Sequence, residues 1–502
     1  MKTYRSMRSA LVLAAALVWL QTSAAQSAGA LSPTPPTLPA PPAALAGAAD
    51  AADGRIDDRR PAAPTPLRLG TAVIKLSGSW EYGDERRKNF DLQDSRARDR
   101  RVREHEIKLE AQAELGDGLS ARLQAVLLHE TRHTQGTAGA LKQHALERGE
   151  MWLQWDRIQG TPWSLQLGRV PLVERRSLWW DDDVDALRLR TVQGPWRLDT
   201  GLARTLLRVS SAEPGIAPDE RGVWRQWGEA GWRWAPRHLL EARWLWVSDR
   251  SGTPAVGTAW PTGTSPDSSD LQARWAGLRA SGEWRAATAG DNRLGYWAEA
   301  VWLRGREQRT AFATAASGAV TAGATVQRAV RGQAVDLGLS WTLGLPLRPS
   351  LTLAYARGSG GPDDDTQDRN FRQTGLHENK VRLAGVKRLR RYGELLQPDL
   401  SNLAVTTLGT GLRLLGNSSL ELVLHRYRQA VPAARVAGAR LSAVPEGLRP
   451  ALGREIDLFL AVREWSWLEL TLRWSRFEPG AAYAPNRRDT AQALELGAAL
   501  NF

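Results

Sequence analysis

Cysteine is absent from this chain of 502 residues, and long hydrophobic runs are almost absent. Without cysteine the chain has no disulfide framework, no thiolate metal site and no cysteine-linked lipid anchor. Residues 10–20 form one uncharged apolar run, which is shorter than the roughly 20 residues that a membrane-spanning helix needs. No later segment is a candidate for such a helix, and the mean hydropathy is negative. These absences exclude a helical membrane protein and a disulfide-rich domain.

The N-terminus has the features of a secretion signal. Lys2, Arg5 and Arg8 precede the apolar run, and small residues follow at 23–25, where a peptidase can cut. We therefore predict a signal peptide at 1–25. Residues 26–66 are rich in proline and alanine and are interpreted as a disordered or cleaved leader segment. The folded domain is expected to span 67–502.

Aromatic residues and charge are both unevenly distributed among residue types. The chain has 23 tryptophans against seven tyrosines and six phenylalanines, and tryptophan favours membrane interfaces. The net charge is +13, with arginine in excess. A secretion signal removes the chain from nucleic acid, so the positive charge indicates an anionic solute or lipopolysaccharide at the outer rim. A tryptophan-rich soluble core is the simpler alternative.

Period-two alternation recurs throughout the domain. In residues 468–475, for example, Leu470 and Leu472 alternate with Glu469 and Arg473, which gives the strand one apolar and one polar face. The same pattern is found in residues 74–82, 106–115, 241–247, 420–427 and 494–502, the last ending on Phe502. Because no helical segment is available to cover the apolar faces, we predict an all-β transmembrane antiparallel barrel of the outer-membrane type. Its length suits roughly 16 to 18 strands around a water-filled lumen.

Short and long connections are expected to alternate, as in barrels with periplasmic turns and extracellular loops. The long polar candidates are residues 129–147, 248–270, 310–328, 358–370 and 430–453.

Two motifs resemble metal sites but lack the right context. Residues 129–133 read His-Glu-Thr-Arg-His, the zinc-protease pattern, yet no helical apolar face surrounds them, so we interpret them as a polar loop. Asp363, Asp364, Asp365 and Asp368 form an acidic cluster without the spacing of a calcium loop. The sequence therefore predicts no metal site and no cofactor.

The segment 165–190 places opposite charges close together. Arg169, Arg175 and Arg176 lie near Glu174 and a run of aspartates at 181–185. Facing charges of this kind build a constriction with a field across a lumen. A solvated, salt-bridged loop is the alternative interpretation.

Several spaced blocks carry a resemblance to a known family. They are Leu-Ala-Tyr-Ala-Arg-Gly-Ser-Gly-Gly from Leu353, Phe-Arg-Gln-Thr-Gly-Leu from Phe371, Arg-Tyr-Gly-Glu from Arg391, Leu-Ser-Asn-Leu from Leu400, and Phe-Glu-Pro-Gly from Phe477 followed by Ala-Tyr at 482–483. With weaker likeness over most of 69–502, the chain resembles the alginate export porins of Gram-negative outer membranes.

The resemblance implies an 18-stranded, monomeric barrel with an arginine-lined, constricted pore and a periplasmic repeat protein nearby. Matched block by block, it implies that the pore-lining positions are Lys75, Arg148, Arg169, Asp181, Asp183, Lys380, Arg388 and Arg473. Two positions that are arginine in the family are Glu110 and Thr471 here. The family's long periplasmic turn before the last strand pair is reduced to about 463–467.

The function implied by the resemblance is export of an anionic exopolysaccharide, alginate or a similar polyuronate, through the outer membrane. The expected partners are this polymer, outer-membrane lipid, lipopolysaccharide and the periplasmic scaffold. A narrow anion-selective porin for small acidic solutes shares the same barrel and stays open as an alternative. An outer-membrane hydrolase would need a Ser–His–acid set, which the sequence does not present, so no enzyme is predicted.

Overall fold

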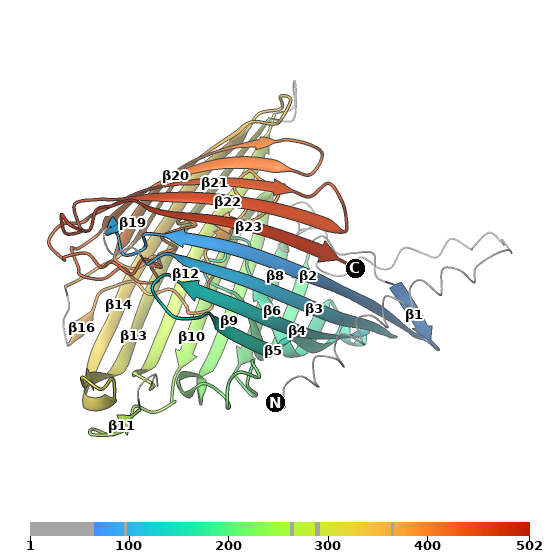
Figure 1. The fold of residues 1–502 in the computed structure, drawn as a ribbon. Helices are drawn as coiled ribbons and strands as arrows, with labels where there is room; N and C mark the ends of the chain where they lie inside the picture. The colour runs from blue at the N-terminus through green and yellow to red at the C-terminus, as the bar shows by residue number, and fades with distance from the viewer. Residues whose placement is uncertain (1–64, 95–97, 262–265, 287–291, 363–365) are drawn as a thin grey trace. The chain divides into compact units, whose positions relative to one another are not determined.

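The computed structural model describes residues 65–94, 98–261, 266–286, 292–362 and 366–502. Eighteen antiparallel strands form a closed barrel, which confirms the predicted fold class. Each wall strand pairs with the next one along the chain, and the last strand, β23, pairs with the first, β2, from Ser79↔Asn501 to Lys88↔Gln492. Figure 1 shows this closure, with red β23 lying beside blue β2. The predicted signal peptide and most of the predicted leader lie outside the described residues.

The wall strands are β2 (Ala72–Lys88), β3 (Arg100–Gly116), β4 (Leu119–Thr134), β5 (Leu141–Trp155), β6 (Trp163–Val173), β7 (Asp181–Gln193), β8 (Trp196–Ala203), β9 (Trp224–Ala235), β10 (His238–Ser248), β12 (Ser269–Arg285), β13 (Arg293–Thr314), β14 (Val320–Thr342), β15 (Ser350–Gly358), β19 (Leu403–Arg413), β20 (Ser419–Gln429), β21 (Ala451–Val462), β22 (Leu468–Pro479) and β23 (Ala491–Asn501). The short strands are β1 (Thr65–Leu69), β11 (Ala259–Trp260), β16 (Gln367–Asp368), β17 (Lys380–Val381) and β18 (Leu389–Arg390). Two 3₁₀ turns are η2 (Ile158–Gly160) and η3 (Pro218–Glu220).

The alternation predicted from sequence has its apolar face outward. In β20, Glu421 and His425 are buried inside the barrel, whereas Leu422 and Leu424 are exposed on its outer surface. A soluble sheet would show the opposite arrangement, with leucine inside and glutamate outside. The polarity of β20 is therefore that of a strand whose outer face lies in hydrocarbon.

Exposed leucines also line up across neighbouring strands. Leu153, Leu167, Leu187 and Leu202 stand opposite one another on β5, β6, β7 and β8. All four are large hydrophobic side chains that remain exposed on the barrel. A continuous apolar row of this kind is typical of a lipid-facing surface. No helix in the described part of the chain is long and apolar enough to cross a membrane.

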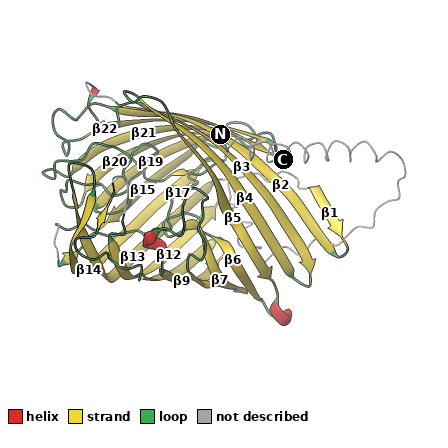
Figure 2. Ribbon diagram, turned by 60° about the horizontal axis from the view of Figure 1, so that its bottom comes forward, coloured by secondary structure: helices red, strands yellow, loops and turns green. Residues whose placement is uncertain are grey.

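The two ends of the barrel differ in the length of their connections. The longest, 359–402, 430–450, 204–223 and 249–268, all lie at the end where β2 finishes, and short turns such as 194–195 lie at the other. Figure 2 shows the loops, drawn green, gathered at one end and inside the barrel. Long connections are extracellular and short ones periplasmic in barrels of this type.

Two of the predicted long loops are wrong. Residues 129–134 belong to β4 and residues 141–147 to β5, so only 135–140 connect them. Likewise β13 and β14 stay paired up to Thr314↔Val320, leaving a connection of 315–319. The first segment is polar and the second is rich in alanine and threonine, but such residues continue a strand where it projects beyond the membrane, because water replaces lipid on the outer face. The predicted loop at 358–370 is instead longer, running over 359–402.

The β6–β7 hairpin leaves the wall before it turns. β5 pairs with β6 only from Met151↔Arg169 to Trp155↔Leu165. Beyond that point β5 pairs with the connection after β8, where the Arg148 N–H donates to the Val209 carbonyl at 2.9 Å and the Ser211 N–H to the Leu146 carbonyl at 2.9 Å. The connection closes the wall, so the end of the hairpin is free to enter the lumen.

Candidate functional site

Two segments fill part of the lumen, and we name them the hairpin tip (174–180) and the inner loop (371–402). They are joined to each other. Trp180 and Leu376 form a parallel β-bridge, and the Asp181 N–H donates to the Leu376 carbonyl at 2.6 Å. The Thr374 hydroxyl donates to the Trp179 carbonyl. The hairpin tip and the inner loop therefore behave as one packed unit inside the barrel.

The hairpin tip is held against the wall at β12 and β13. Glu174 pairs with Arg279 at 3.1 Å, and the Trp179 indole donates to Glu299 at 2.7 Å. A side chain at Gly277 would collide with the Trp179 ring, so glycine is required where the tip lies against β12. These strands are several positions around the barrel from β6 and β7, so the tip reaches across the lumen.

The inner loop is held at β14. Asp336 accepts a hydrogen bond from the Tyr392 hydroxyl at 3.1 Å and pairs with Arg391. It also pairs with Arg176 of the hairpin tip at 3.4 Å. Burial would raise the pKa of Glu174, but Arg243, Arg279 and backbone N–H groups outweigh burial and lower it. The charges that anchor the unit are thus compensated inside the protein.

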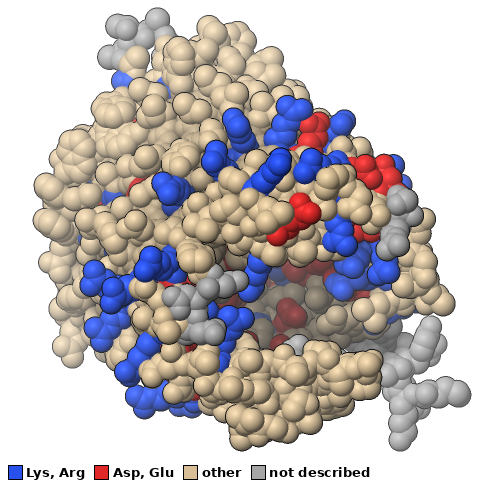
Figure 3. Space-filling model, turned by 90° about the vertical axis from the view of Figure 1, so that its left-hand side faces the viewer, with Lys and Arg blue, Asp and Glu red and all other residues tan. Residues whose placement is uncertain are grey.

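A cavity of about 480 Å³ remains in the lumen on the opposite side. Its wall is built by β2, β3, β4, β22 and β23, and Lys387, Arg390, Gln397 and Arg440 approach from the loops. The charged residues that line it are Glu81, Glu85, Glu104, Glu106, Glu130, Glu469 and Glu495, together with Arg87, Arg132, Lys387, Arg390, Arg440 and Arg473. Seven acidic and six basic residues therefore line the same cavity. Because the two charges are nearly balanced, the predicted arginine lining is not confirmed. Figure 3, which faces the long-connection end, shows Lys and Arg around a hollow with Asp and Glu inside it.

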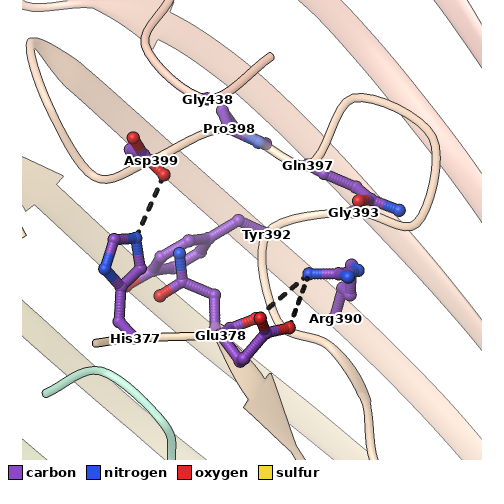
Figure 4. Close-up of a pocket in the computed structure, with 10 residues that line it drawn as sticks. His377, Glu378, Arg390, Tyr392, Gly393, Gln397, Pro398, Asp399 and Gly438 are labelled. Carbon is purple, nitrogen blue, oxygen red and sulfur yellow. Dashed lines mark hydrogen bonds and ion pairs between the residues drawn. The ribbon is translucent and has the colours of Figure 1, made fainter. Parts of the chain in front are cut away.

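A smaller cavity of about 160 Å³ lies beside it and shares Arg390 and Gln397. Figure 4 shows His377 pointing toward Asp399, and Glu378 toward Arg390. The His377 ring nitrogen lies 3.1 Å from the Asp399 carboxylate. The two cavities therefore meet at the inner loop.

Two predicted site residues are brought together across 207 positions of sequence. The Arg388 guanidinium donates to the Asp181 carboxylate at 2.9 Å. Ser177 of the hairpin tip donates to the same carboxylate at 2.8 Å. The pair thus joins the inner loop to the start of β7, where the constriction was expected.

Lys380 lies in a second ion-pair cluster on the inner loop. Its ammonium is 3.1 Å from Glu378, and Arg390 is 3.6 Å from the same carboxylate. Burial alone would raise the pKa of Glu378, but the charges of Lys380 and Arg390 outweigh burial and lower it. One carboxylate therefore holds two cations.

Arg148 and Arg169 stabilise the barrel wall. Arg148 makes two contacts of 3.1 Å with Asp185 and also donates to the carbonyls of Arg208 and Leu207. Arg169 donates to the Arg148 carbonyl at 3.1 Å. Both arginines hold together the place where the hairpin leaves the barrel.

The other predicted positions are separate from this group. Lys75 pairs with Glu114 at 2.5 Å near the short-turn end. Arg473 lines the large cavity and pairs with Glu495 at 2.8 Å. Asp183 lies in β7 opposite Pro171 and is partly buried.

Sequence reasoning missed Glu378, Arg390 and Arg440. Arg440 pairs with Glu85 of β2 at 2.7 Å, which ties the 430–450 connection to the cavity wall. Arg390 directly precedes the block that begins at Arg391, and this adjacency was the only signal for it. Arg440 lies in a connection without any recognisable pattern.

Within the described residues, no group of three or more His, Cys, Asp or Glu side chains could hold a metal ion. The interpretation of His129–His133 as a loop is wrong, because these residues lie in β4. His129 stacks on His144 of β5 and His105 of β3. Of the acidic cluster, 363–365 lie outside the described residues, and Asp368 accepts from Arg372 and Asn370.

Comparison with known proteins places these features in a family. The sequence profile of the alginate export family matches residues 73–495. The alginate production protein AlgE of Pseudomonas aeruginosa is 27% identical over 365 residues, covering 68% of this chain and 71% of AlgE. AlgE of Pseudomonas syringae pv. tomato is 24% identical over 348 residues, covering 65% and 67%.

Solved structures support the fold. Pseudomonas aeruginosa OpdK with vanillate has a TM-score of 0.51 at 12% identity, and covers 86% of this chain and 99% of OpdK. A second OpdK structure has a TM-score of 0.51 at 13% identity with the same coverage. The profile match extends over most of the barrel, from β2 to β23. This chain is an outer-membrane β-barrel and belongs to the alginate export family.

Proposed function

We propose that this protein is an outer-membrane porin that exports alginate or a similar anionic polyuronate. The proposal is supported by membership of the alginate export family and by the AlgE relatives, which are named for alginate production. The structural observation that supports the proposal is the set of cations near the lumen cavities, each paired with a carboxylate of the protein itself.

Three such arrangements lie on or beside the route. Arg388 is held by Asp181, Lys380 and Arg390 by Glu378, and Arg473 by Glu495. A uronate polymer carries about one carboxylate per sugar, so it can replace these internal carboxylates one after another. A solvent-exposed ion pair is worth about 0.2–1 kcal/mol, and of the three arrangements Lys380 with Glu378 is the most exposed. Contacts this weak attract the polymer and release it, which a single tight site would not.

Several finer parts of the proposal go with this function. Because export makes and breaks no covalent bond, the protein acts without catalysis. The barrel functions as a monomer beside a periplasmic repeat-protein scaffold. Residues 1–25 direct secretion, 26–66 form a leader, and 67–502 form the barrel. The short 463–467 turn leaves no room for a long periplasmic lid.

The export role is tested by secretion. In a polyuronate-producing strain that lacks its own export porin, the wild-type gene should restore polymer secretion. The Arg388→Glu/Arg473→Glu variant should secrete roughly ten-fold less, which corresponds to about 1.4 kcal/mol in the rate-limiting barrier. Arg250→Glu/Arg435→Glu, which changes charge equally at exposed loop positions, is the matched control.

The outcomes separate the candidate functions. Unchanged secretion by the Arg388/Arg473 variant in folded form would contradict the cation series. Failure of the wild-type gene to restore secretion would contradict polymer export itself. In planar bilayers, long polyuronate should block the channel current. If uronic-acid monomers passed through while polymer left the current unchanged, the protein would be a porin for small acids.

A further inference from the structure

Three arginines stand together on the outer face of the barrel, away from the lumen cavity with its balanced charges. Arg274, Arg304 and Arg331 stand directly opposite one another on β12, β13 and β14. All three side chains are exposed. We name these residues the arginine row.

The neighbours of the arginine row show which face it occupies. The residues one position to each side along β12, Ala273 and Trp275, are buried inside the barrel. Two rows toward the middle of the wall, Leu278 and Val335 are exposed hydrophobic residues on the same face as the arginines. Because strand side chains alternate, the arginine row must point outward, at the edge of the apolar band.

The row lies at the height of a membrane interface. Trp246 stands opposite Arg274, and Trp302 lies one row below Arg304, with about 45% and 46% of each tryptophan exposed. Exposed tryptophans on a barrel mark the level of the lipid headgroups. Arg274 is only a few residues from the start of β12 at Ser269, at the end with long connections. The arginine row therefore faces the outer leaflet.

The described residues supply little counter-charge to the row. The Arg274 guanidinium lies 5.7 Å from the Trp246 ring, and Arg306, one row above, donates to Gln272 at 2.8 Å. Within the described residues, no ion pair is formed by Arg274, Arg304 or Arg331. The arginine row contains no aspartate or glutamate on β12, β13 and β14. The row above it, formed by Gln272, Arg306 and Ala329, contains none either.

Some outward arginines elsewhere on the wall are paired with a carboxylate. Arg101 lies beside Asp84, and Arg454 lies 2.5 Å from Glu478. Like charges directly opposite each other destabilise a sheet. A row of three such residues is therefore tolerated best where an external anion neutralises it.

We propose that the arginine row binds the phosphate groups of an outer-leaflet glycolipid of the lipid A type. Adjacent strands lie about 4.8 Å apart, so three guanidinium groups span roughly 10 Å, and each offers the paired donors that match a phosphate. The acyl chains of the same lipid lie on Trp302, Leu278 and Val335 below. The site binds a structural lipid and is independent of the exported polymer.

The test measures lipid retention by the full-length protein in detergent. Bisphosphorylated lipid A is titrated and the complex is counted by native mass spectrometry. Arg274→Gln/Arg304→Gln/Arg331→Gln should bind at least ten-fold more weakly than wild type. The matched control, Arg233→Gln/Arg237→Gln/Arg435→Gln, removes three exposed arginines elsewhere and should bind like wild type. Heat-modifiable mobility on gels verifies that each variant is folded.

Three further probes distinguish the sources of the anion. Dephosphorylated lipid A should bind wild type and the row variant equally weakly. Inorganic phosphate and an oligouronate should each fail to displace bound lipid A at equal concentration. Equal lipid A binding by the folded row variant and wild type would overturn the proposal. So would displacement by the oligouronate, which would make the row a polymer site.

Discussion

Single charged residues decide how the lumen is filled. Glu174 accepts backbone N–H groups from Arg176 and Leu178 and also pairs with Arg279 of the wall. The carboxylate is fully inside the protein, so both the turn and the ion pair depend on it. A buried charge of this kind is costly to leave without a partner.

We expect Glu174→Gln to lower the free energy of unfolding by about 2–3 kcal/mol, because a neutral amide cannot balance buried Arg279. Urea unfolding of the barrel in lipid vesicles measures the change. Glu213→Gln, an exposed residue in the connection after β8, is the control and should change stability by less than about 0.5 kcal/mol. Equal stability of the two variants would show that the hairpin tip contributes nothing to the fold.

Glu378 provides a prediction about pH. Burial opposes its charge, but Lys380 and Arg390 dominate and lower its pKa below the ordinary value of 4.5. A lowered folded-state pKa means that the carboxylate adds stability that is fully present above about pH 4.5 and is lost as the pH falls through the lower folded value. The stability difference between wild type and Glu378→Gln should therefore shrink below that pH. A difference that stays constant from neutral to acid pH would contradict this assignment.

At the scale of elements, the inner loop and the wall are separable. The wall is a continuous ladder of 18 paired strands, and the 359–402 connection, which contains the inner loop, joins β15 to β19 without contributing a wall strand. The two neighbours pair directly from Ser350↔Gly411 to Arg357↔Ala404. The barrel can therefore close whether or not the loop fills it.

Replacing 376–399 with a Gly–Ser linker should leave a folded barrel with a several-fold larger single-channel conductance in planar bilayers. The reason is geometric, since this segment borders both lumen cavities. Shortening the 249–268 connection, which lines neither cavity, should leave the conductance unchanged. An unaltered conductance after loop replacement would mean that ions do not pass the inner loop.

At the scale of the whole molecule, net charge and pore charge differ. The chain carries +13, yet the large cavity has seven acidic and six basic lining residues. Net charge steers a distant ion, but selectivity inside a pore depends on the groups that line it.

The wild-type channel should accordingly show weak selectivity among small ions. Under a salt gradient across a planar bilayer, we expect a reversal potential close to zero. Glu104→Gln/Glu106→Gln/Glu130→Gln should shift it toward anion selectivity, because these carboxylates lie together on the cavity wall. A strongly anion-selective wild-type channel would contradict the balance of charges described for the cavity.

The sequence predicted the wall well because lipid imposes a local rule. Every second residue must be apolar where a strand faces hydrocarbon, so Leu470 outside and Glu469 inside could be assigned without any neighbours. The rule fails beyond the membrane. There, as at 129–134, polar residues on both faces are compatible with strand or loop.

The candidate site was only partly predictable. The resemblance to the family pointed to Asp181 and Arg388 as site residues. Their contact, however, requires the β6–β7 hairpin to leave the wall, and no local sequence pattern predicts this. Arg148 and Arg169, which the resemblance placed along the pore, make contacts that hold the wall where the hairpin departs. Only the folded loop shows that Glu378 is the partner of Lys380 and Arg390.

The sequence by itself determined that this chain is a β-barrel with a lipid-facing leucine surface and a family of export porins as its relatives. The alternation of apolar and polar residues and the spaced family blocks depend on residues close together in the sequence, so they are recognised without a structure. Only the tertiary structure decided where charge accumulates, because pairing depends on residues brought together from distant strands. It brought Arg274, Arg304 and Arg331 together on the outside and balanced the cavity with glutamate within.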